Sequence, residues 1–298
     1  MTIQTNSDTE INETHGVLSG PMRKPFNEHL QAESSIHHDE TAQKVGMRGG
    51  TIAGSYHFEQ FVPLFLKAFG DEWFKTGSIS LYFKNASTHL EPVQAFMRAP
   101  AADDNTQVDI WMTHENGMMV AEGTASIGSP EQPSALRQRF NNRHPPGEVR
   151  ILNYLSPGME IPETKVSIGA DQIRDRFDRI TEPLDWYIND SPFGGPILSP
   201  AQVNEVMRWA MIQQESQRPS EVVGLFGALE FRFLNGPVYA GKEYINSGRI
   251  LAVGETPKTE YYWFEGLLTD PDTKIKVAES LILIRIMKIS SDLYPELR

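Results

Sequence analysis

The first long apolar stretch of the chain lies between two glycine-containing segments. Residues 51–69 carry apolar side chains around most of the circumference of a helix, and Gly49-Gly50 precede them while Gly70 follows. A helix that is apolar on nearly all sides is buried on nearly all sides, and glycine is common just beyond helix ends. We therefore expect residues 51–69 to form one buried helix.

Four strand-like runs follow this helix, each bounded by turn residues. Asn116-Gly117 separates the last two runs, and this dipeptide is a strong signal for a two-residue hairpin turn. The four expected strands are Ser78–Lys84, Val93–Ala99, Gln107–His114 and Met118–Ile127.

The same order of elements recurs in the second half of the chain. Ser199 is a good N-cap and Pro200 suits the first helical position, so we expect a helix from Pro200 to Gln214. A helix followed by a strand meander, twice, predicts an α+β fold in which antiparallel sheet wraps a long central helix in each repeat. The four expected strands are Leu225–Leu234, Glu243–Val253, Thr259–Leu268 and Lys274–Ile289.

The repeat divides the chain into four expected parts. Residues 1–20 are expected to be a disordered N-terminal tail, because the first sixteen residues are polar. Residues 21–128 form the first repeat and residues 164–298 the second. Residues 129–163, which are rich in Pro, Gln, Arg and Asn, are expected to be a linker on the surface.

Composition narrows the class of protein. A net charge of -12 over 298 residues argues against nucleic-acid binding, which needs clustered basic residues. The absence of cysteine excludes disulfides, thiolate catalysis and cysteine-zinc sites. Neither an 18-residue apolar run nor a secretory signal is present, so we expect no membrane partner and a cytoplasmic location. Long strands with free edges favour a homodimer.

A glycine-rich motif occurs once in each half. Residues 46–54 read Gly-Met-Arg-Gly-Gly-Thr-Ile-Ala-Gly, and residues 191–199 read Ser-Pro-Phe-Gly-Gly-Pro-Ile-Leu-Ser. Only the first copy follows histidines, in the run Ile36-His37-His38-Asp39. The pattern indicates a duplicated domain in which the first half carries the chemistry and the second is a structural or tunnel-forming partner.

These motifs resemble the MaoC-like dehydratase and (R)-specific enoyl-CoA hydratase superfamily, in its double hotdog form. The resemblance implies a hydro-lyase that acts on an enoyl or 3-hydroxyacyl thioester, carried by CoA or an acyl-carrier protein, without a metal or other cofactor. It covers roughly residues 25–128 and 165–290. Its matching segments are residues 36–39, Ala42, residues 46–54, 77–83 and 91–93 in the first half, and residues 191–197, 229–233 and 236–241 in the second.

The chain departs from the superfamily at one position that matters for catalysis. The related hydratases carry Asp-x-Asn-Pro-x-His, whereas Ala32 stands here five residues before His37, and serines replace the Asn-Pro pair. Glu33 lies four residues before His37 and five before His38. The acid partner of the histidine is therefore either Glu33, in a shifted register, or absent.

Three residues are candidate catalytic groups. His37 can accept or donate a proton at neutral pH, as hydration of a double bond requires. Glu33 would assist if desolvation raised its pKa, and is otherwise a surface residue. Asp39 either orients His37 or caps the next helical turn. Adjacent His37-His38-Asp39 side chains point apart, which disfavours a metal site.

Four further residues are candidate substrate-binding groups. Gly49, Gly50 and Thr51 stand at the expected helix start, where free backbone N–H groups could polarise a thioester carbonyl; otherwise the glycines serve only a tight turn. His57 lies within the apolar helix and either lines a tunnel or is a hydrogen-bonded core residue.

Three other functions remain open on this pattern. The first is a hotdog thioesterase, in which His37 or Glu33 directs water at the carbonyl. The second is a specialised isomerase or cyclase. The third is a protein that binds acyl chains or other small molecules without catalysis, which the replacement by Ala32 favours.

Overall fold

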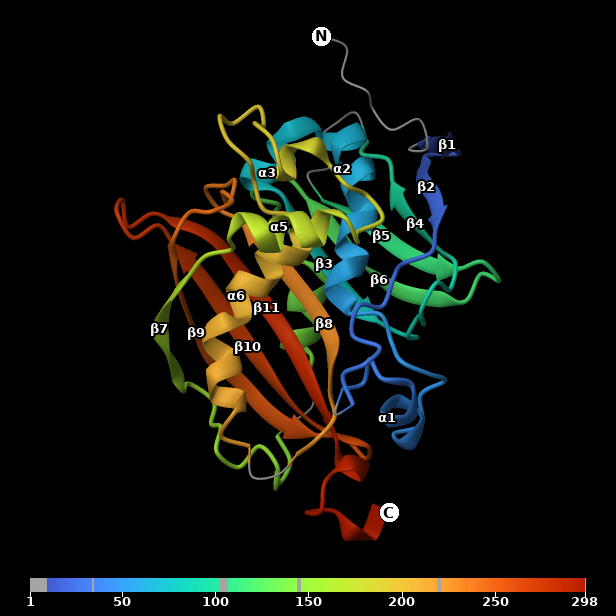
Figure 1. The fold of residues 1–298 in the computed structure, drawn as a ribbon, viewed down its shortest axis with the longest axis vertical. Helices are drawn as coiled ribbons and strands as arrows, with labels where there is room; N and C mark the ends of the chain where they lie inside the picture. The colour runs from blue at the N-terminus through green and yellow to red at the C-terminus, as the bar shows by residue number, and fades with distance from the viewer. Residues whose placement is uncertain (1–9, 34, 102–106, 144–145, 219–220, 298) are drawn as a thin grey trace.

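The structure is a computed structural model that describes residues 10–33, 35–101, 107–143, 146–218 and 221–297. Its central feature is a single antiparallel sheet of eleven strands in the order β1-β2-β4-β5-β6-β3-β8-β11-β10-β9-β7 within the described residues. Residues 1–9 of the expected disordered tail lie outside this description. Figure 1 shows the sheet running through the whole molecule, with most helices gathered on one side of it.

All eight predicted strands are confirmed, and three strands were not expected. The unexpected strands are β1 and β2 near the N-terminus and β7 between the halves. The first half contains β1 (Asn12–Thr14), β2 (Val17–Arg23), β3 (Ser78–Phe83), β4 (Val93–Arg98), β5 (Gln107–His114) and β6 (Met119–Ser126). The second half contains β7 (Glu160–Val166), β8 (Gly224–Phe233), β9 (Tyr244–Glu255), β10 (Thr259–Thr269) and β11 (Lys276–Met287).

The first central helix is shorter than expected, and the described residues contain more helices than the two predicted. The α-helices are α1 (Asp39–Lys44), α2 (Val62–Phe69), α3 (Trp73–Thr76), α4 (Ala135–Asn141), α5 (Ala170–Phe177) and α6 (Pro200–Glu215). The 3-10 helices are η1 (Gly54–Phe61), η2 (Gly70–Glu72), η3 (Asp185–Tyr187), η4 (Lys288–Ser290) and η5 (Pro295–Leu297).

The prediction of one helix over residues 51–69 is wrong. Residues 54–61 form the 3-10 helix η1, and an α-helix begins only at Val62. Proline has no N–H, so Pro63 cannot donate to the carbonyl of Glu59 as an α-helix would require. Val62 donates to that carbonyl instead, which is the i to i−3 pattern of a 3-10 helix. The prediction of burial is confirmed for residues 55–61, which are all buried, whereas Lys67 in α2 is exposed.

The second central helix begins at Pro200 as predicted. It contains 16 residues and contacts η1 of the first half as well as β7, β9 and β10 of its own half. The backbone N–H of Ser199 donates to the side chain of Gln202 at 3.4 Å, which satisfies one group at the helix start. The expectation of an α+β fold with a central helix wrapped by antiparallel sheet is therefore confirmed.

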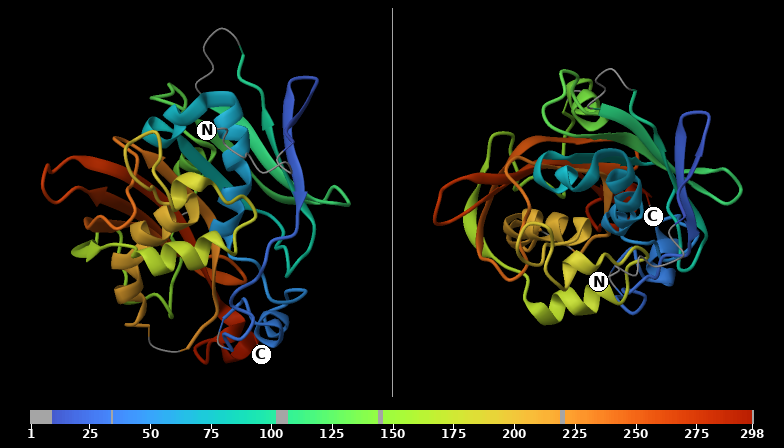
Figure 2. Two further views of the ribbon diagram at one scale, coloured as in Figure 1. Left: turned by 45° about the horizontal axis from the view of Figure 1, so that its top comes forward. Right: turned by 90° about the horizontal axis from the view of Figure 1, so that it is seen from above.

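The two halves join through antiparallel pairing of β3 with β8. Leu81 lies opposite Leu229 in this pair, and both are fully buried. Figure 2 shows the sheet curving around the helices on one face, while α4 lies alone on the opposite face. We call these the inner and outer faces of the sheet.

The expected tail and linker are more structured than predicted. Residues 12–20 belong to the β1–β2 hairpin. This hairpin is part of the sheet, because Leu18 is buried and pairs with Met97 of β4. The expected linker, residues 129–163, contains α4 and the first part of β7, so a boundary at residue 164 would divide a strand. Arg137 holds α4 to the sheet through ion pairs with Glu230 at 2.9 Å and Glu279 at 3.1 Å.

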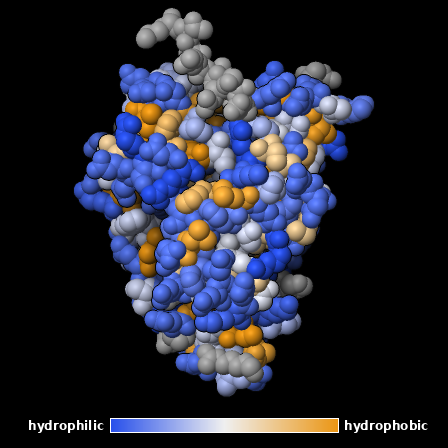
Figure 3. Space-filling view, turned by 45° about the vertical axis from the view of Figure 1, so that its right-hand side comes forward, coloured by the Kyte–Doolittle hydropathy of each residue, from blue (hydrophilic) through white to orange (hydrophobic). Residues whose placement is uncertain are grey.

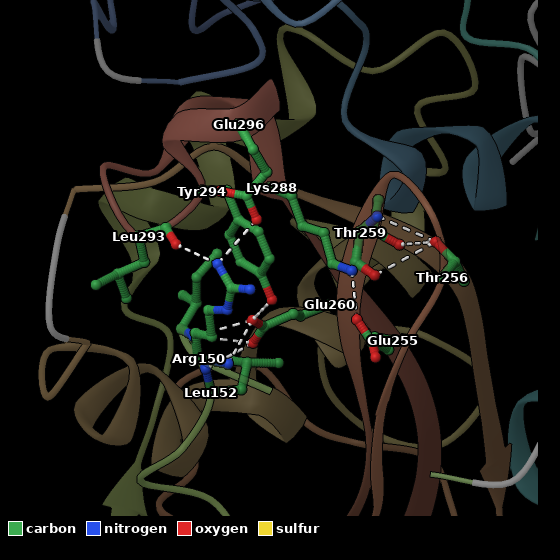
Figure 4. A network of polar contacts seen from close by, with 11 residues as sticks. Arg150, Leu152, Glu255, Thr256, Thr259, Glu260, Lys288, Leu293, Tyr294 and Glu296 are labelled. Carbon is green, nitrogen blue, oxygen red and sulfur yellow. Dashed lines mark hydrogen bonds and ion pairs between the residues drawn. The ribbon is translucent and has the colours of Figure 1, made fainter. Parts of the chain in front are cut away.

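A buried carboxylate fixes the end of the linker to the second half. The side chain of Glu260 is fully buried and accepts backbone N–H groups from residues 150–152 at distances of 2.7 to 3.0 Å. The hydroxyl of Tyr294 donates to the same carboxylate, as Figure 4 shows. The linker, β10 and the C-terminal segment are thereby joined at one point.

The face of the protein shown in Figure 3 is largely polar. Figure 3 shows one face of the molecule, on which hydrophobic residues occur in small groups separated by hydrophilic ones. None of the helices among the described residues combines the length and the apolar character needed to cross a bilayer.

Candidate functional site

A cavity of about 730 Å³ opens where the pairing of β3 with β8 ends. The last residues paired are Tyr82 and Ala228. Beyond them, residues 83–88 of the first half and residues 224–227 of the second separate and line the cavity. His37, Gly49, Thr51 and His57 also line it, whereas Glu33, Asp39 and Gly50 do not. Both halves therefore contribute to one site.

His37 is held in a defined orientation at the wall of this cavity. Its Nδ1 atom lies 2.6 Å from the backbone carbonyl oxygen of Thr51, so Nδ1 carries the hydrogen and donates it. The Nε2 atom is then an unprotonated acceptor. The side chain of Asn27, itself buried, donates to the carbonyl of His37 at 2.9 Å and fixes the backbone.

Burial lowers the pKa of His37 below its ordinary value. The hydrogen bond to Thr51 and the nearby carboxylate of Glu28 act in the opposite direction, while His29, whose ring centroid lies 5.4 Å away, reinforces the decrease. The net effect keeps the imidazole neutral at neutral pH. A neutral histidine with a free Nε2 is the form that can accept a proton.

Asp39 positions the glycine turn and does not line the cavity. Its Oδ1 atom accepts the backbone N–H of Gly50 at 2.7 Å. Neither alternative expected for Asp39 is observed. The carboxylate bonds to Gly50 and not to the His37 side chain. The N-cap residue of α1 is His38 and not Asp39. The carboxylate acts across eleven residues on the turn that follows α1.

The expected carbonyl-binding role of Gly50 and Thr51 is wrong. The N–H of Gly50 donates to Asp39, and the N–H of Thr51 donates to the carbonyl of Ile36 at 3.0 Å. These two hydrogens are therefore not free for a substrate. No helix begins at this turn either, because η1 starts at Gly54. Gly50 has a different role: a Cβ atom there would lie 2.1 Å from the carbonyl oxygen of His37.

Glu33 is exposed, and the structure does not place it in the cavity. Its backbone carbonyl accepts the hydroxyl of Thr41, which holds the loop before α1. The carboxylate that does influence His37 is Glu28, which sequence reasoning missed. Glu28 lies 3.2 Å from Nε2 of His29 and also pairs with Arg176 and Arg179. No local sequence pattern distinguishes it from other glutamates.

A buried histidine–serine pair forms a second polar group in the cavity wall. The Nε2 atom of His57 lies 2.9 Å from Oγ of Ser87, and both side chains are almost fully buried. Burial lowers the pKa of His57 to about 4, so its ring is neutral at neutral pH. His57 therefore both lines the cavity and makes a core hydrogen bond, and Ser87 was not anticipated.

Two adjacent backbone groups connect His37 to Ser87. The carbonyl of Thr51 accepts from His37, and the N–H of the next residue, Ile52, donates to the carbonyl of Ser87 at 2.9 Å. Residues 51–52 therefore contact His37 on one side and the backbone of Ser87 on the other. The cavity wall therefore contains the neutral imidazoles of His37 and His57 together with the hydroxyl of Ser87.

The second half has an equivalent backbone arrangement with apolar side chains. Thr51 bridges to Thr88 in the first half, and Ile197 bridges to Tyr239 in the second. By the spacing from these bridges, His57 corresponds to Val203 and Ser87 to Val238. Both valines are buried. The duplicated fold thus carries its polar pair in the first half.

Cationic side chains line the part of the cavity contributed by the second half. Arg208 and Arg218 both pair with Glu215, at 3.5 and 3.0 Å, and Arg285 also lines the cavity. Among the residues that the structure describes, no group of three His, Asp or Glu side chains is arranged to hold a metal ion. The cavity therefore offers acid–base and anion-binding groups.

Known proteins resemble this chain in structure and not detectably in sequence. Neither a protein-family model nor a curated protein sequence matches it. A putative MaoC domain protein dehydratase from Chloroflexus aurantiacus superposes with a TM-score of 0.56 and 14% identity, covering 94% of each chain. A conserved hypothetical protein from Mycobacterium tuberculosis with a double hotdog fold has a TM-score of 0.57 and 10% identity, covering 94% of this chain and 97% of that one.

A further structure, described as a MaoC-like dehydratase, has a TM-score of 0.53 and 10% identity, covering 93% of this chain and 98% of that one. At these identities the similarity concerns the fold. The chain has the double hotdog fold, and its structural neighbours include MaoC-like dehydratases.

Proposed function

We propose that the protein is a hydratase or dehydratase that acts on an enoyl or 3-hydroxyacyl thioester, with His37 as its general base. The observation that carries this proposal is the contact of His37 Nδ1 with the Thr51 carbonyl, which leaves Nε2 as an acceptor in a cavity of about 730 Å³. The double hotdog fold shared with MaoC-like dehydratases supports it as an analogy.

The chemistry follows from the protonation state of His37. In hydration, Nε2 removes a proton from water while the water oxygen bonds to the β-carbon of the enoyl thioester. The electrons of the double bond move toward the thioester oxygen, and the α-carbon then takes a proton from the imidazolium. Dehydration is the reverse sequence, so one histidine can move the proton in both directions.

Ser87 is the group best suited to bind the thioester oxygen. If His57 carries its hydrogen on Nε2, it donates to Ser87 Oγ, and the serine hydroxyl can donate to the substrate. A donor directed at developing negative charge in a buried site contributes strongly to catalysis. This assignment gives the hydroxyl the role that the N–H groups of Gly50 and Thr51 cannot take.

The test uses a panel of enoyl-CoA and 3-hydroxyacyl-CoA thioesters, followed by the absorbance of the conjugated enoyl group and by thiol release together. We expect the enoyl band to change without release of thiol. His37→Ala should lower kcat by about 10²- to 10⁴-fold, the usual contribution of a general base. His38→Ala is the matched control, because His38 does not line the cavity. Full turnover by His37→Ala would refute the proposal.

The His57–Ser87 pair supports a second candidate, a thioesterase. A neutral histidine within hydrogen-bond distance of a serine can activate that serine for attack on a thioester carbonyl. The bond broken would then be the carbon–sulfur bond, and the thiol would leave with a proton from His57. Thiol release that disappears in Ser87→Ala would favour this function over hydration. In the hydratase, Ser87→Ala lowers the rate of enoyl conversion and no thiol appears in either protein.

A further inference from the structure

A second cavity, of about 550 Å³, lies on the outer face of the sheet beside α4. Its floor is formed by the buried side chains of Tyr261, Trp263 and Leu283, which come from β10 and β11 of the second half. One wall is formed by the helix α4, which includes Arg139, and by Arg143 just beyond its end. The cavity is therefore aromatic at its base and basic along its side.

The charge of this cavity is opposite to that of the protein. The chain has 39 acidic and 27 basic residues, yet the described residues lining the cavity include three arginines and no acidic residue. Arg139 pairs with Glu122 at 2.7 Å, but Glu122 also pairs with Lys84 at 3.0 Å. One carboxylate is thus shared between two cations, which leaves an excess of positive charge.

The remaining two arginines make contacts that leave their charge available. The guanidinium of Arg143 lies 4.2 Å from the centre of the Phe140 ring and donates to the Phe140 carbonyl. Arg285 donates to the hydroxyl of Tyr82 at 3.3 Å. Both partners are neutral, so each arginine keeps its full charge for an anion.

The second cavity adjoins the first, and the two share part of their lining. Tyr82 and Arg285 line both cavities. Glycine at position 227 makes room for this arrangement, because a Cβ atom there would lie 2.7 Å from Nε of Arg285. A bulge in the pairing of β8 with β11 falls between Leu283 and Ile284, opposite Gly227. A ligand that occupied both cavities would therefore pass beside Tyr82 and Arg285, at the end of the β3–β8 pairing.

We propose that the second cavity binds the phosphorylated nucleoside end of a CoA thioester whose acyl end occupies the first cavity. This inference rests on the proposed function for the acyl half of the ligand. Aromatic and guanidinium planes stack on a purine base, and arginine binds phosphate oxygens through paired hydrogen bonds. The expected linker then has a specific role, because α4 supplies Arg139 and the segment just after it supplies Arg143.

The direct test is calorimetric titration with adenosine 3′,5′-bisphosphate, the nucleotide portion of CoA. Arg143→Glu should weaken binding by about tenfold or more, since it removes a charge-assisted contact and adds a repulsive charge. Arg174→Glu is the matched control, because Arg174 is an exposed arginine on α5 that lines neither cavity. Adenosine without phosphate should bind more weakly than the bisphosphate.

A second measurement separates failure of this site from failure of the proposed chemistry. KM for a CoA thioester should rise in Arg143→Glu with kcat nearly unchanged, whereas the corresponding pantetheine thioester should show the same KM in both proteins. Nucleotide binding that is lost in Arg143→Glu, without turnover of any thioester, would support the nucleotide site and reject the hydratase. No nucleotide binding by the wild type, or equal KM values for both thioesters, would overturn the site even if hydration is observed.

Discussion

The backbone of Gly50 packs directly against the carbonyl group of His37, so closely that a Cβ atom at position 50 would lie 2.1 Å from that oxygen. Such a contact is impossible for a real side chain, and His37 would have to move. The glycine therefore sets the position of the candidate base, although it does not itself line the cavity.

Gly50→Ala should lower kcat by about 10²-fold or more, because a displacement of about 1 Å in a catalytic group costs about that much. The glycine motif of the second half provides a control. A Cβ atom at Gly195 would meet only the Tyr239 ring, at 3.8 Å, which is an ordinary contact. We expect Gly195→Ala to retain wild-type activity, and steady-state kinetics of the two variants would test this. Equal activities would contradict the positioning role of Gly50.

Asp39 should act on the same turn through its hydrogen bond to Gly50. Asp39→Ala removes the acceptor for that N–H, and we expect a loss of about 1 kcal/mol in the free energy of unfolding together with a reduced kcat. Asp39→Asn retains the oxygen acceptor and should keep most of the wild-type unfolding free energy and most of the wild-type kcat. Urea denaturation and kinetics on the two variants give the comparison. A kcat that is unchanged in Asp39→Ala would show that the turn holds its position without this bond.

The pH dependence of turnover should report the protonation of His37. Because burial lowers the pKa of His37, kcat/KM should fall with decreasing pH through a midpoint below the ordinary histidine value of about 6.5. The negative charge of Glu28 raises the pKa of His37 and so opposes this effect. Glu28→Gln should therefore move the midpoint to still lower pH. A shift to higher pH would contradict the electrostatic link between the two residues.

Glu59 should make the stability of the protein depend on pH. Its side chain is fully buried, and burial raises its pKa to about 7. The folded state therefore binds a proton more tightly than the unfolded state, whose carboxyl group titrates near pH 4.5. The associated stability is present below about pH 4.5 and is lost as the pH rises to about 7, a decrease of about 3 kcal/mol.

Glu59→Gln replaces this group with a neutral side chain of the same shape. We expect the variant to unfold at the same urea concentration as the wild type at pH 5 and at a higher concentration at pH 8. The backbone N–H of Ala201 can still donate to the amide oxygen, as it does to the carboxylate. A wild-type pH profile in Glu59→Gln would mean that another group carries the dependence.

Glu260 should be the most sensitive single position outside the site. Glu260→Ala leaves three backbone N–H groups and the Tyr294 hydroxyl without their acceptor, and we expect a loss of about 3 to 5 kcal/mol in unfolding free energy. Glu296, in the same network (Figure 4) but about half exposed, pairs with Arg150. Glu296→Ala should cost far less unfolding free energy than Glu260→Ala, because solvent screens an exposed ion pair. Equal losses of unfolding free energy in the two variants would contradict this difference between the buried and the exposed glutamate.

The strands could be predicted from the sequence because their signals are local. Alternating side chains and Asn116-Gly117 identify β5, β6 and their turn within a few residues. The position of His37 beside a glycine turn was also predictable, from motif resemblance. The break in the first central helix was overlooked, although Pro63 is visible in the sequence and accounts for it.

The rest of the site depends on contacts between distant residues. Ser87 meets His57 across thirty residues, and Asp39 meets Gly50 across eleven. Neither pair forms a local pattern, so neither could be recognised before the fold was known. Glu33 shows the converse: its spacing to His37 was suggestive, but the loop before α1 directs it to solvent.

In the pairing of β3 with β8, each half of the molecule supplies the strand that covers an edge of the other half. A fragment containing only the first half would present β3 as a bare edge, with unpaired N–H and C=O groups beside a buried strand. The second half would present β8 in the same way. We therefore expect the halves to unfold together in one cooperative step, and either half expressed alone to self-associate through its uncovered edge.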